Sequence, residues 1–359
     1  MPFRVAIVND LAMAREALRR VVGTMPGVTV AWMAADGAEA IANAGKDRPD
    51  LVLMDLIMPG VDGVEATRTI MRQSPCPIVV VTATVEGNAS RVYEAIGAGA
   101  LDAVDTPRLA TTGAQGAQAL ITKIEEVRRM RAGDAPSVRG SACAASPIAA
   151  AADQLAEASK STPLPPIVAV GSSTGGPQAL ATMMQGLPNP APFAIVIVQH
   201  MEPAFLPGLV SWLASQTGRD VRLAKDGMRP QANTVTIAGE DRQLVATSTG
   251  TLCYCEGPIE LIHRPSVDML FESLATSDVP PGVAVLLTGM GRDGAAGMAS
   301  LRAKGWDTLA QDQASSVVWG MPGAAFESGA AARAVPIKEM GAAITDAIAR
   351  RRAQKGGAR

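Results

Sequence analysis

The sequence has no long hydrophobic run, almost no net charge and few cysteines, and each shortage argues against a class of protein. No apolar stretch approaches the roughly 18 residues of a membrane span, and the apolar start of the chain lacks a signal-peptide cleavage site. A formal net charge of -2 disfavours binding to nucleic acid or to anionic lipid. Because 48% of the residues are hydrophobic, we expect a globular, cytoplasmic protein that binds no nucleic acid and does not enter a membrane.

Cysteine and histidine are also scarce. The chain has four unevenly placed cysteines, which suits a reducing compartment: Cys76, Cys143, Cys253 and Cys255. The Cys-x-Cys pair lacks two further nearby ligands, so a metal site there is disfavoured. Only two histidines, His200 and His263, are available to act as a general base.

A chain of 359 residues is too long for one compact core, and its pattern divides it into two α/β domains. Residues 1–131 alternate short apolar runs with amphipathic segments, which is typical of a doubly wound parallel sheet. The runs are expected to be strands with the spatial order 2-1-3-4-5: Phe3–Val8, Val28–Ala34, Leu51–Met54, Ile78–Val81 and Leu101–Val104. Residues 132–165 are rich in Ala, Ser and Pro and are expected to form a flexible linker.

The alternation resumes in residues 166–351, where we expect a second α/β domain with a mainly parallel sheet. Its predicted strands are Ile167–Val170, Phe193–Val198, Thr234–Ile237 and Val283–Leu287. Residues 234–260 are richer in Thr, Val, Tyr and Cys, which indicates hairpin structure.

Acidic and hydroxyl side chains follow the predicted strands of the first domain. Asp10 follows the first strand, Asp55 the third and Thr82 the fourth. The first and third strands are neighbours in the expected order, so the two carboxylates would face each other as hard oxygen ligands do around Mg²⁺. A carboxylate beside Mg²⁺ can also accept a phosphoryl group. Alternatively, Asp10 caps a helix that starts near Met13, and Asp55 belongs to the turn MPGVDG.

The stretches VND, LVLMDLIMPGVDG and VVVTA around these residues resemble response-regulator receiver domains. The resemblance implies phosphorylation of Asp55 by a CheA-type histidine kinase, with Mg²⁺ as cofactor. It implies that Asp10, Asp55 and the carbonyl of Ile57 surround the metal ion. It also implies that Thr82 senses the phosphoryl group.

Two positions depart from the receiver pattern. The acidic pair expected before the first helix is Asn9-Asp10, and the lysine expected before the proline that follows the fifth strand is Thr106. The first change removes a carboxylate ligand, and the second removes a positive charge near the phosphoryl oxygens. We expect phosphorylation at Asp55 with weakened Mg²⁺ binding.

In the second domain, the loop GSSTGG directly follows a predicted strand. The spacing Gly171-x-Ser173-x-Gly175 fits the strand–turn–helix elbow that exposes a serine nucleophile. Free backbone N–H groups at the start of the following helix could stabilise an oxyanion. A phosphate cradle is the rival interpretation, but Pro177 stands where a Walker lysine would be.

A serine nucleophile needs a base and an acid that orients this base. His200 directly follows a predicted strand and so shares the sheet edge with the serine loop, whereas His263 lies in an irregular segment. Asp293 is the one acid in the loop TGMGRDGAAGM, which follows another strand. This aspartate could instead cap a helix that begins near Ala295. Because three strand ends supply Ser, His and Asp to one edge, we favour a catalytic set.

The motifs GSSTGGP, QHM, HRPSVDMLF and LLTGMGRDGAAGM, behind a receiver and a linker, resemble the chemotaxis protein-glutamate methylesterase (CheB) family over essentially the full chain. The resemblance implies Ser173 as the nucleophile, His200 as general base and acid, and Asp293 as the orienting acid. Thr174 and Met290 match positions that line the family's site, where backbone N–H groups are the implied oxyanion donors.

The reaction that the resemblance implies is hydrolysis of glutamate γ-methyl esters on methylated chemoreceptor-type proteins through an acyl-enzyme, with glutamine deamidation by the same route and no cofactor for the esterase. Ser172 stands where the family's GASTGG has alanine. The pairing of VND with DTP further resembles a Wsp-type subgroup that serves surface-sensing pathways. Two other classes stay open, a catalytically dead scaffold whose receiver binds partners and an esterase of small molecules.

Overall fold

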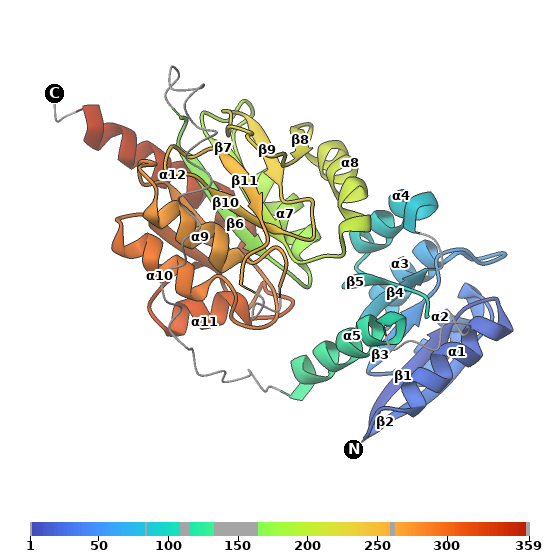
Figure 1. Cartoon of the computed structure of the whole chain (residues 1–359). Helices are drawn as coiled ribbons and strands as arrows, with labels where there is room; N and C mark the ends of the chain where they lie inside the picture. The colour runs from blue at the N-terminus through green and yellow to red at the C-terminus, as the bar shows by residue number, and fades with distance from the viewer. Residues whose placement is uncertain (1, 83–84, 108–114, 133–163, 259–262, 357–359) are drawn as a thin grey trace. The chain divides into compact units, whose positions relative to one another are not determined.

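The computed structural model describes residues 2–82, 85–107, 115–132, 164–258 and 263–356. The chain forms two compact units, Met1–Ala135 and Pro136–Arg359, each with its own sheet (Figure 1). The predicted linker, residues 132–165, lies almost entirely outside the described residues. Within the described ranges, no helix is long and apolar enough to cross a membrane.

The first unit contains a five-stranded parallel sheet in the order β2-β1-β3-β4-β5, which confirms the predicted order. The strands are β1 (Phe3–Val8), β2 (Val28–Ala34), β3 (Leu51–Met54), β4 (Ile78–Thr82) and β5 (Asp102–Asp105). The helices are α1 (Ala12–Gly23), α2 (Gly37–Lys46), α3 (Gly63–Gln73), α4 (Val85–Gly97) and α5 (Gln115–Ala132). α1 packs beside α5, whereas α3 packs between α2 and α4, so helices cover both faces of the sheet (Figure 1).

Burial and helix caps account for the ends of these elements. Every residue of β3 and β4 is buried, as expected for central strands of a sheet that is covered on both faces. Helices α2 and α3 begin after Asp36 and Asp62, whose carboxylates accept the backbone N–H groups of Glu39 and Glu65. These caps account for the start of α2 and the start of α3.

The second unit contains a seven-stranded sheet in the order β14-β13-β12-β6-β7-β9-β8, with every neighbouring pair parallel. Its strands are β6 (Ile167–Ser172), β7 (Ala194–Gln199), β8 (Asp220–Leu223), β9 (Thr234–Ile237), β12 (Val283–Leu286), β13 (Asp307–Gln311) and β14 (Arg333–Val335). Strands β10 (Gln243–Ala246) and β11 (Leu252–Cys255) form a separate antiparallel hairpin, as predicted for this section. The prediction of a mainly parallel sheet is confirmed, with β8, β13 and β14 in addition to the predicted strands.

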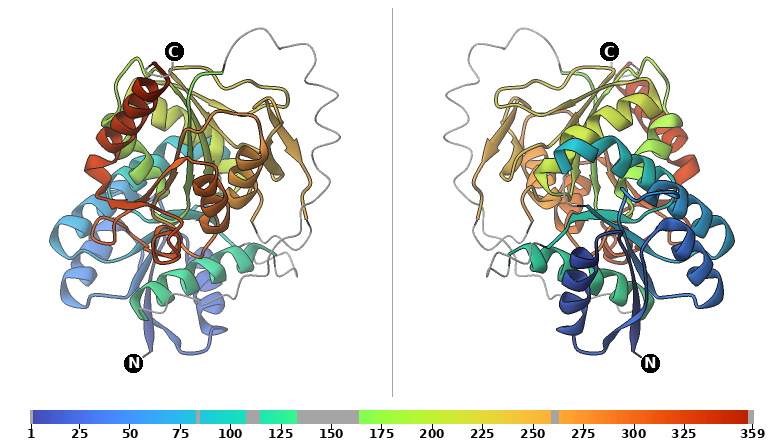
Figure 2. Two further views of the ribbon diagram at one scale, coloured as in Figure 1. Left: turned by 90° about the vertical axis from the view of Figure 1, so that its left-hand side faces the viewer. Right: turned by 90° about the vertical axis from the view of Figure 1, so that its right-hand side faces the viewer.

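Helices cover both faces of the second sheet. They are α7 (Gly176–Gln185), the short η2 (Pro203–Phe205), α8 (Leu206–Thr217), α9 (Val267–Thr276), α10 (Ala295–Ala303), α11 (Met321–Glu327) and α12 (Ile337–Gly356). α7 packs against α8 and α12, whereas α10 packs against α9 and α11, and Figure 2 shows these two groups on opposite sides of the strands. Buried side chains such as Leu270, Phe271 and Met298 belong to the core between the second group and the sheet.

The centre of the second sheet brings three predicted strand ends together. β6 pairs with β7 on one side and with β12 on the other, and Gly171 is in register with both Val198 and Leu286. Because the three strands are parallel, the loops that follow them lie at one edge of the sheet. These loops contain the predicted serine, histidine and aspartate.

Candidate active site and phosphorylation site

The serine loop forms a tight turn between β6 and α7. Gly175, the residue before α7, has a φ of 77°, in the left-handed region that favours glycine. A Cβ at Gly176 would lie 2.0 Å from Oε1 of Gln199, so this position has no room for a side chain. The backbone N–H of Ser173 donates to the carbonyl of Thr288 at 3.1 Å, which joins the loop to the end of β12. The glycines therefore allow the turn and the close packing that hold Ser173.

The two serines of the loop have different surroundings. Ser172 is the last residue of β6, is fully buried, and donates its hydroxyl to Oε1 of Gln199 at 2.7 Å. Nε2 of the same glutamine donates to the carbonyls of Ser173 at 2.9 Å and His200 at 3.0 Å. The hydroxyl of Ser172 thus has a structural partner, whereas Ser173 is the serine at the turn itself.

His200 and Asp293 are in direct contact. Nε2 of His200 lies 2.8 Å from Oδ2 of Asp293, and each side chain is only 9% exposed. The backbone N–H of His200 donates to the carbonyl of Ser172 at 2.9 Å, which fixes the histidine beside the serine loop. Nδ1 of His200 is buried and has no hydrogen-bond partner among the residues that the structure describes. One ring nitrogen is therefore bonded to the acid, and the other makes no hydrogen bond within the described residues.

Asp293 does not cap the helix that follows it. α10 has no side-chain cap, whereas the Asp293 carboxylate accepts the backbone N–H groups of Val267 at 2.7 Å and Asp268 at 3.0 Å, at the start of α9. It also accepts the hydroxyl of Ser266 at 2.7 Å. Burial acts to raise the pKa of Asp293, but the hydrogen bond and charge of His200, with the N–H groups of α9, outweigh burial and hold that pKa well below its usual range. The alternative of a cap for α10 is therefore wrong, and Asp293 is ionised.

Asp268, in the first turn of α9, makes the corresponding contact with α10. Its Oδ1 accepts the backbone N–H of Gly297 at 2.7 Å. Burial raises the pKa of Asp268 to about 7, and the charge of Asp293 adds to this effect against the hydrogen bonds from Gly297 and Gly294. The start of each helix is thus bound by a carboxylate, a favourable arrangement with the helix dipole.

Thr174 and Met290 lie on two chain segments that meet at Ser173. The carbonyl of Thr174 accepts the hydroxyl of Thr288, which follows β12, at 3.0 Å. Met290 follows Gly289, and a Cβ at Gly289 would lie 2.8 Å from Cβ of Ser173. The segment after β12 therefore lies directly against the serine loop.

The sequence analysis missed Gln199 and Ser266 at this edge, and it considered His263 as a base but missed its contact with His200. Gln199 ends an otherwise apolar strand, and Ser266 precedes a helical pattern as an N-cap does, so both had a local signal. His263 had none, because its ring stacks on that of His200, from a distant part of the sequence, with 4.1 Å between ring centroids and 11° between ring planes.

In the first unit, Asp55 follows β3 and lies beside Asn9, which follows β1. Nδ2 of Asn9 donates to Oδ2 of Asp55 at 2.9 Å, and Oδ1 of Asp55 accepts the N–H groups of Leu56 at 2.7 Å and Ile57 at 3.4 Å. Burial raises the pKa of Asp55 to about 6, and the negative charge of Asp10 raises it as well. The hydrogen bonds from the N–H groups of Ile57 and Leu56 act to lower this pKa. A cation beside the two carboxylates would offset the cost, so these residues fit the expected Mg²⁺.

The surroundings of Asp10 exclude the capping alternative. Helix α1 begins after Leu11 and has no side-chain cap. Oδ1 of Asn9 accepts the backbone N–H of Leu11 at 2.9 Å. Nη1 of Arg15 donates to the backbone carbonyls of Asn9 at 2.6 Å and Asp10 at 3.0 Å, so a guanidinium that the sequence analysis missed holds the end of β1.

Thr82 and Thr106 lie on neighbouring strand ends. Thr82 is buried at the end of β4, and its carbonyl accepts the backbone N–H of Thr106 at 2.9 Å. Oγ1 of Thr106 is buried without a hydrogen-bond partner in the described part of the chain. Since β1, β3 and β4 are consecutive in the sheet, Asp10, Asp55 and Thr82 share one edge.

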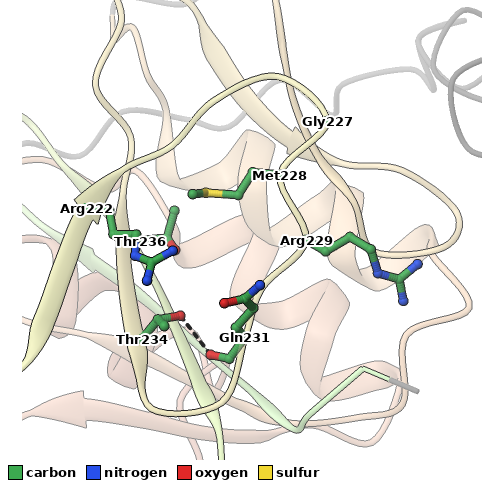
Figure 3. A pocket seen from close by; sticks show the side chains of 7 residues that line it. All are labelled: Arg222, Gly227, Met228, Arg229, Gln231, Thr234 and Thr236. Atoms are coloured by element: carbon green, nitrogen blue, oxygen red, sulfur yellow. Dashed lines mark hydrogen bonds between the residues drawn. The ribbon is translucent and has the colours of Figure 1, made fainter. Parts of the chain in front are cut away.

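A pocket of about 390 Å³ lies elsewhere in the second unit, beside β8 and β9 (Figure 3). Its lining residues are Arg222, Gly227, Met228, Arg229, Gln231, Thr234 and Thr236. Arg222 is ion-paired with Asp220, and Figure 3 shows Arg229 directed away from the other side chains. None of the predicted site residues lines this pocket.

Two protein-family descriptions match the chain, CheB methylesterase over residues 168–344 and response regulator receiver domain over residues 5–110. The chain is 46% identical over 352 residues to protein-glutamate methylesterase/protein-glutamine glutaminase 4 of Burkholderia thailandensis, which covers 98% of this chain and 99% of that protein. It is 45% identical over 348 residues to protein-glutamate methylesterase/protein-glutamine glutaminase 1 of Pseudomonas fluorescens, which covers 97% of this chain and 100% of that protein. A solved structure, the Thermotoga maritima CheB methylesterase catalytic domain, is 33% identical, covers 51% of this chain and 98% of that one, and has a TM-score of 0.48.

The two sheets and the matches to both units define a response regulator in which a receiver domain precedes an α/β enzyme domain. The identity of 46% with the Burkholderia thailandensis protein, over nearly the whole length of both chains, narrows this class to one family. The chain belongs to the CheB family of protein-glutamate methylesterases/protein-glutamine glutaminases.

Proposed function

We propose that this chain is a phosphorylation-regulated protein-glutamate methylesterase that hydrolyses glutamate γ-methyl esters on chemoreceptor-type signalling proteins. The observation that carries the proposal is the hydrogen-bonded pair of His200 and Asp293 at the sheet edge that also carries Ser173. The names of the full-length relatives point to the same two reactions, ester hydrolysis and glutamine deamidation. Both observations favour an enzyme over an inactive scaffold.

In the proposed reaction, Ser173 is the nucleophile and His200 is the base. Nε2 of His200 is bonded to Asp293, so Nδ1 is the nitrogen that takes the proton from Oγ of Ser173 as this oxygen attacks the ester carbonyl carbon. The proton then passes to the methoxy oxygen, the ester carbon–oxygen bond breaks, and methanol leaves. The ionised Asp293 stabilises the intermediate imidazolium.

Water completes the cycle by hydrolysing the acyl-enzyme. Nδ1 of His200 takes a proton from the water as its oxygen attacks the acyl carbon, and the same proton returns to Oγ of Ser173 as glutamate is released. A glutamine side chain follows the same route, with ammonia as the leaving group in place of methanol. No step needs a metal ion.

Backbone N–H groups beside Ser173 are the proposed oxyanion donors. Thr174 and Met290 line the site in this proposal, on the two segments that meet at Gly289. Such donors act in a site where water is largely excluded, and removal of one typically costs about 10² to 10³ in kcat.

Asp55 is the proposed phosphoryl acceptor, with a CheA-type histidine kinase as the donor. Asp10, Asp55 and the carbonyl of Ile57 would hold Mg²⁺, which when bound would neutralise charge on the phosphoryl oxygens. Nδ2 of Asn9 already donates to Asp55 and would have to share or leave that carboxylate on phosphorylation. Thr82, at the end of the neighbouring strand, is the proposed sensor of the phosphoryl group.

The experiment that tests this function measures methanol release from membranes that carry methyl-labelled chemoreceptors, with the full chain and with a His200→Gln variant. We expect release by the wild type and almost none by the variant, because glutamine cannot act as the base. Release by neither protein would support an inactive scaffold. Turnover of p-nitrophenyl acetate without release from receptors would instead support an esterase of small molecules.

A further inference from the structure

The two histidines of the chain lie face to face at the candidate active site. Their ring centroids are 4.1 Å apart, and the ring planes differ by 11°. His200 is 9% exposed, whereas His263 is an exposed residue. The His263 ring therefore shields one face of the His200 imidazole from solvent.

The chain segment that carries His263 is tied to the hairpin and to the orienting acid. Gln243 is buried on β10; its Nε2 donates to the carbonyl of His263 at 2.9 Å, and its Oε1 accepts the N–H of Ser266 at 2.7 Å. The hydroxyl of Ser266 in turn donates to Asp293 at 2.7 Å. The segment from His263 to Ser266 therefore acts on His200 at two places. The ring of His263 stacks on the His200 ring, and Ser266 donates to Asp293, which is bonded to Nε2 of His200.

A hydrogen bond at Nε2 alone leaves the ring plane of His200 poorly fixed. The terminal χ2 torsion of histidine has a broad energy profile, so the ring can turn while its bond to Asp293 persists. A flat ring stacked on one face restricts this rotation, because turning the imidazole would lose the parallel contact. The direction of Nδ1, which is the atom that must reach Ser173, depends on this plane.

We propose that His263 is a positioning residue, whose stacked ring holds the imidazole of His200 in the plane that the reaction with Ser173 requires. This inference rests on the proposed function, in which His200 activates that serine. It requires a flat ring at position 263 and does not require a second titrating group. His263→Phe keeps the ring, His263→Leu keeps bulk without planarity, and His263→Ala opens the face to water.

The first test measures how fast a fluorophosphonate labels Ser173 in the full chain. In this reaction a bond forms between Oγ and phosphorus, fluoride leaves, and the serine proton passes to His200, so the rate reports activation of the serine without any receptor. We expect labelling to slow by about two- to tenfold in His263→Ala and His263→Leu, and to stay near the wild-type rate in His263→Phe. Ser173→Ala is the unlabelled control.

The second test detects the stack itself. The chain contains two histidines, so the proton NMR spectrum has two imidazole rings, and His263→Phe leaves only that of His200. We expect the His200 ring protons in His263→Ala to shift away from their wild-type position by the loss of the neighbouring ring current, and those in His263→Phe to stay shielded. A thermal unfolding midpoint near that of the wild type shows that the variants are folded.

The results separate this inference from the proposed function. Equal labelling rates in the wild type, His263→Ala and His263→Leu would overturn the positioning role alone. Slow labelling of His263→Phe, or identical His200 shifts in the Ala and Phe variants, would do the same. A wild type that the probe does not label would overturn the role of Ser173 and the positioning role with it.

Discussion

Asp293 and Asp268 bind the starts of two neighbouring helices. Asp293 binds the start of α9, which carries Asp268, and Asp268 binds the start of α10, which follows Asp293. The Asp293 carboxylate accepts N–H groups of Val267 and Asp268 in α9, and the Asp268 carboxylate accepts the N–H of Gly297 in α10. Two buried carboxyl groups this close do not both ionise without cost. Asp293, which is bound to His200, keeps its charge, and Asp268 has the raised pKa of about 7.

The raised pKa of Asp268 predicts a fall in stability with rising pH. In the unfolded chain the pKa of an aspartate is about 3.9. Between about pH 4 and pH 7 the folded protein therefore keeps a proton on Asp268 that the unfolded chain has lost. The stabilising contribution of the protonated group is complete below about pH 4 and is lost as the pH rises to about 7. Asp268→Asn cannot ionise but can still accept the N–H of Gly297.

We therefore expect the free energy of unfolding of Asp268→Asn to rise relative to the wild type by roughly 1–4 kcal/mol between pH 4 and pH 8. Denaturant unfolding of the full chain at several pH values, read on the transition of the second unit, measures this difference. Asp278→Asn, at an exposed residue just past the other end of α9, is the matched control and should follow the wild type. Parallel curves for Asp268→Asn and wild type would show that Asp268 is already ionised across this range.

Crowding at Gly289 predicts a loss of activity without any change in the reacting groups. A Cβ at this position would lie 2.4 Å from Sδ of Met321 and 2.8 Å from Cβ of Ser173, so Gly289→Ala must displace the serine loop or its neighbour. We expect a fall of at least tenfold in kcat and a loss of about 1–3 kcal/mol in stability. Gly23→Ala, where nothing lies within 4 Å of the added carbon, should change neither quantity appreciably. Full activity of Gly289→Ala would mean that Ser173 need not stay in this position.

The contact between Asn9 and Asp55 predicts how the receiver responds to Mg²⁺. Incubation of the full chain with acetyl phosphate and Mg²⁺ should add the mass of one phosphoryl group, and Asp55→Ala should abolish the addition. Asn9→Asp replaces the amide that donates to Asp55 by a further carboxylate, so half-maximal labelling should need severalfold less Mg²⁺. Labelling that persists in Asp55→Ala would move the acceptor to another residue, and a higher Mg²⁺ requirement in Asn9→Asp would exclude position 9 from the metal site.

The sequence was sufficient to predict the strands in which apolar and β-branched residues predominate. It was insufficient for β13, which reads DTLAQ, because its buried polar side chains look like those of a loop. In the structure the hydroxyl of Thr308 donates to the carbonyl of Ala330 at 2.8 Å, and Nε2 of Gln311 donates to that of Ser315 at 2.7 Å. Ala330 lies in a distant part of the sequence, so no local pattern reveals that the hydroxyl of Thr308 is satisfied.

The candidate active site also has parts that local sequence patterns reveal and parts that depend on contacts between distant segments. Strand ends can be located from apolar runs, and the parallel order of the sheet then brings Ser173, His200 and Asp293 to one edge. His263 belongs to no helix or strand, and its contact with His200 joins distant parts of the sequence, so no sequence period reveals it. The structure favours Ser173 over Ser172 as the proposed nucleophile, because Gln199 accepts the hydroxyl of Ser172. The sequence alone does not reveal this contact.

The most direct measurement compares Ser173→Ala and Ser172→Ala in the release of methanol from membranes with methyl-labelled receptors. Ser172→Ala loses one hydrogen bond to Gln199, which should cost about 1 kcal/mol in stability and leave most of the activity. Ser173→Ala loses the proposed nucleophile, and its rate should fall by about 10⁴ to 10⁶. An active Ser173→Ala beside an inactive Ser172→Ala would contradict the proposed mechanism and move the nucleophile by one residue.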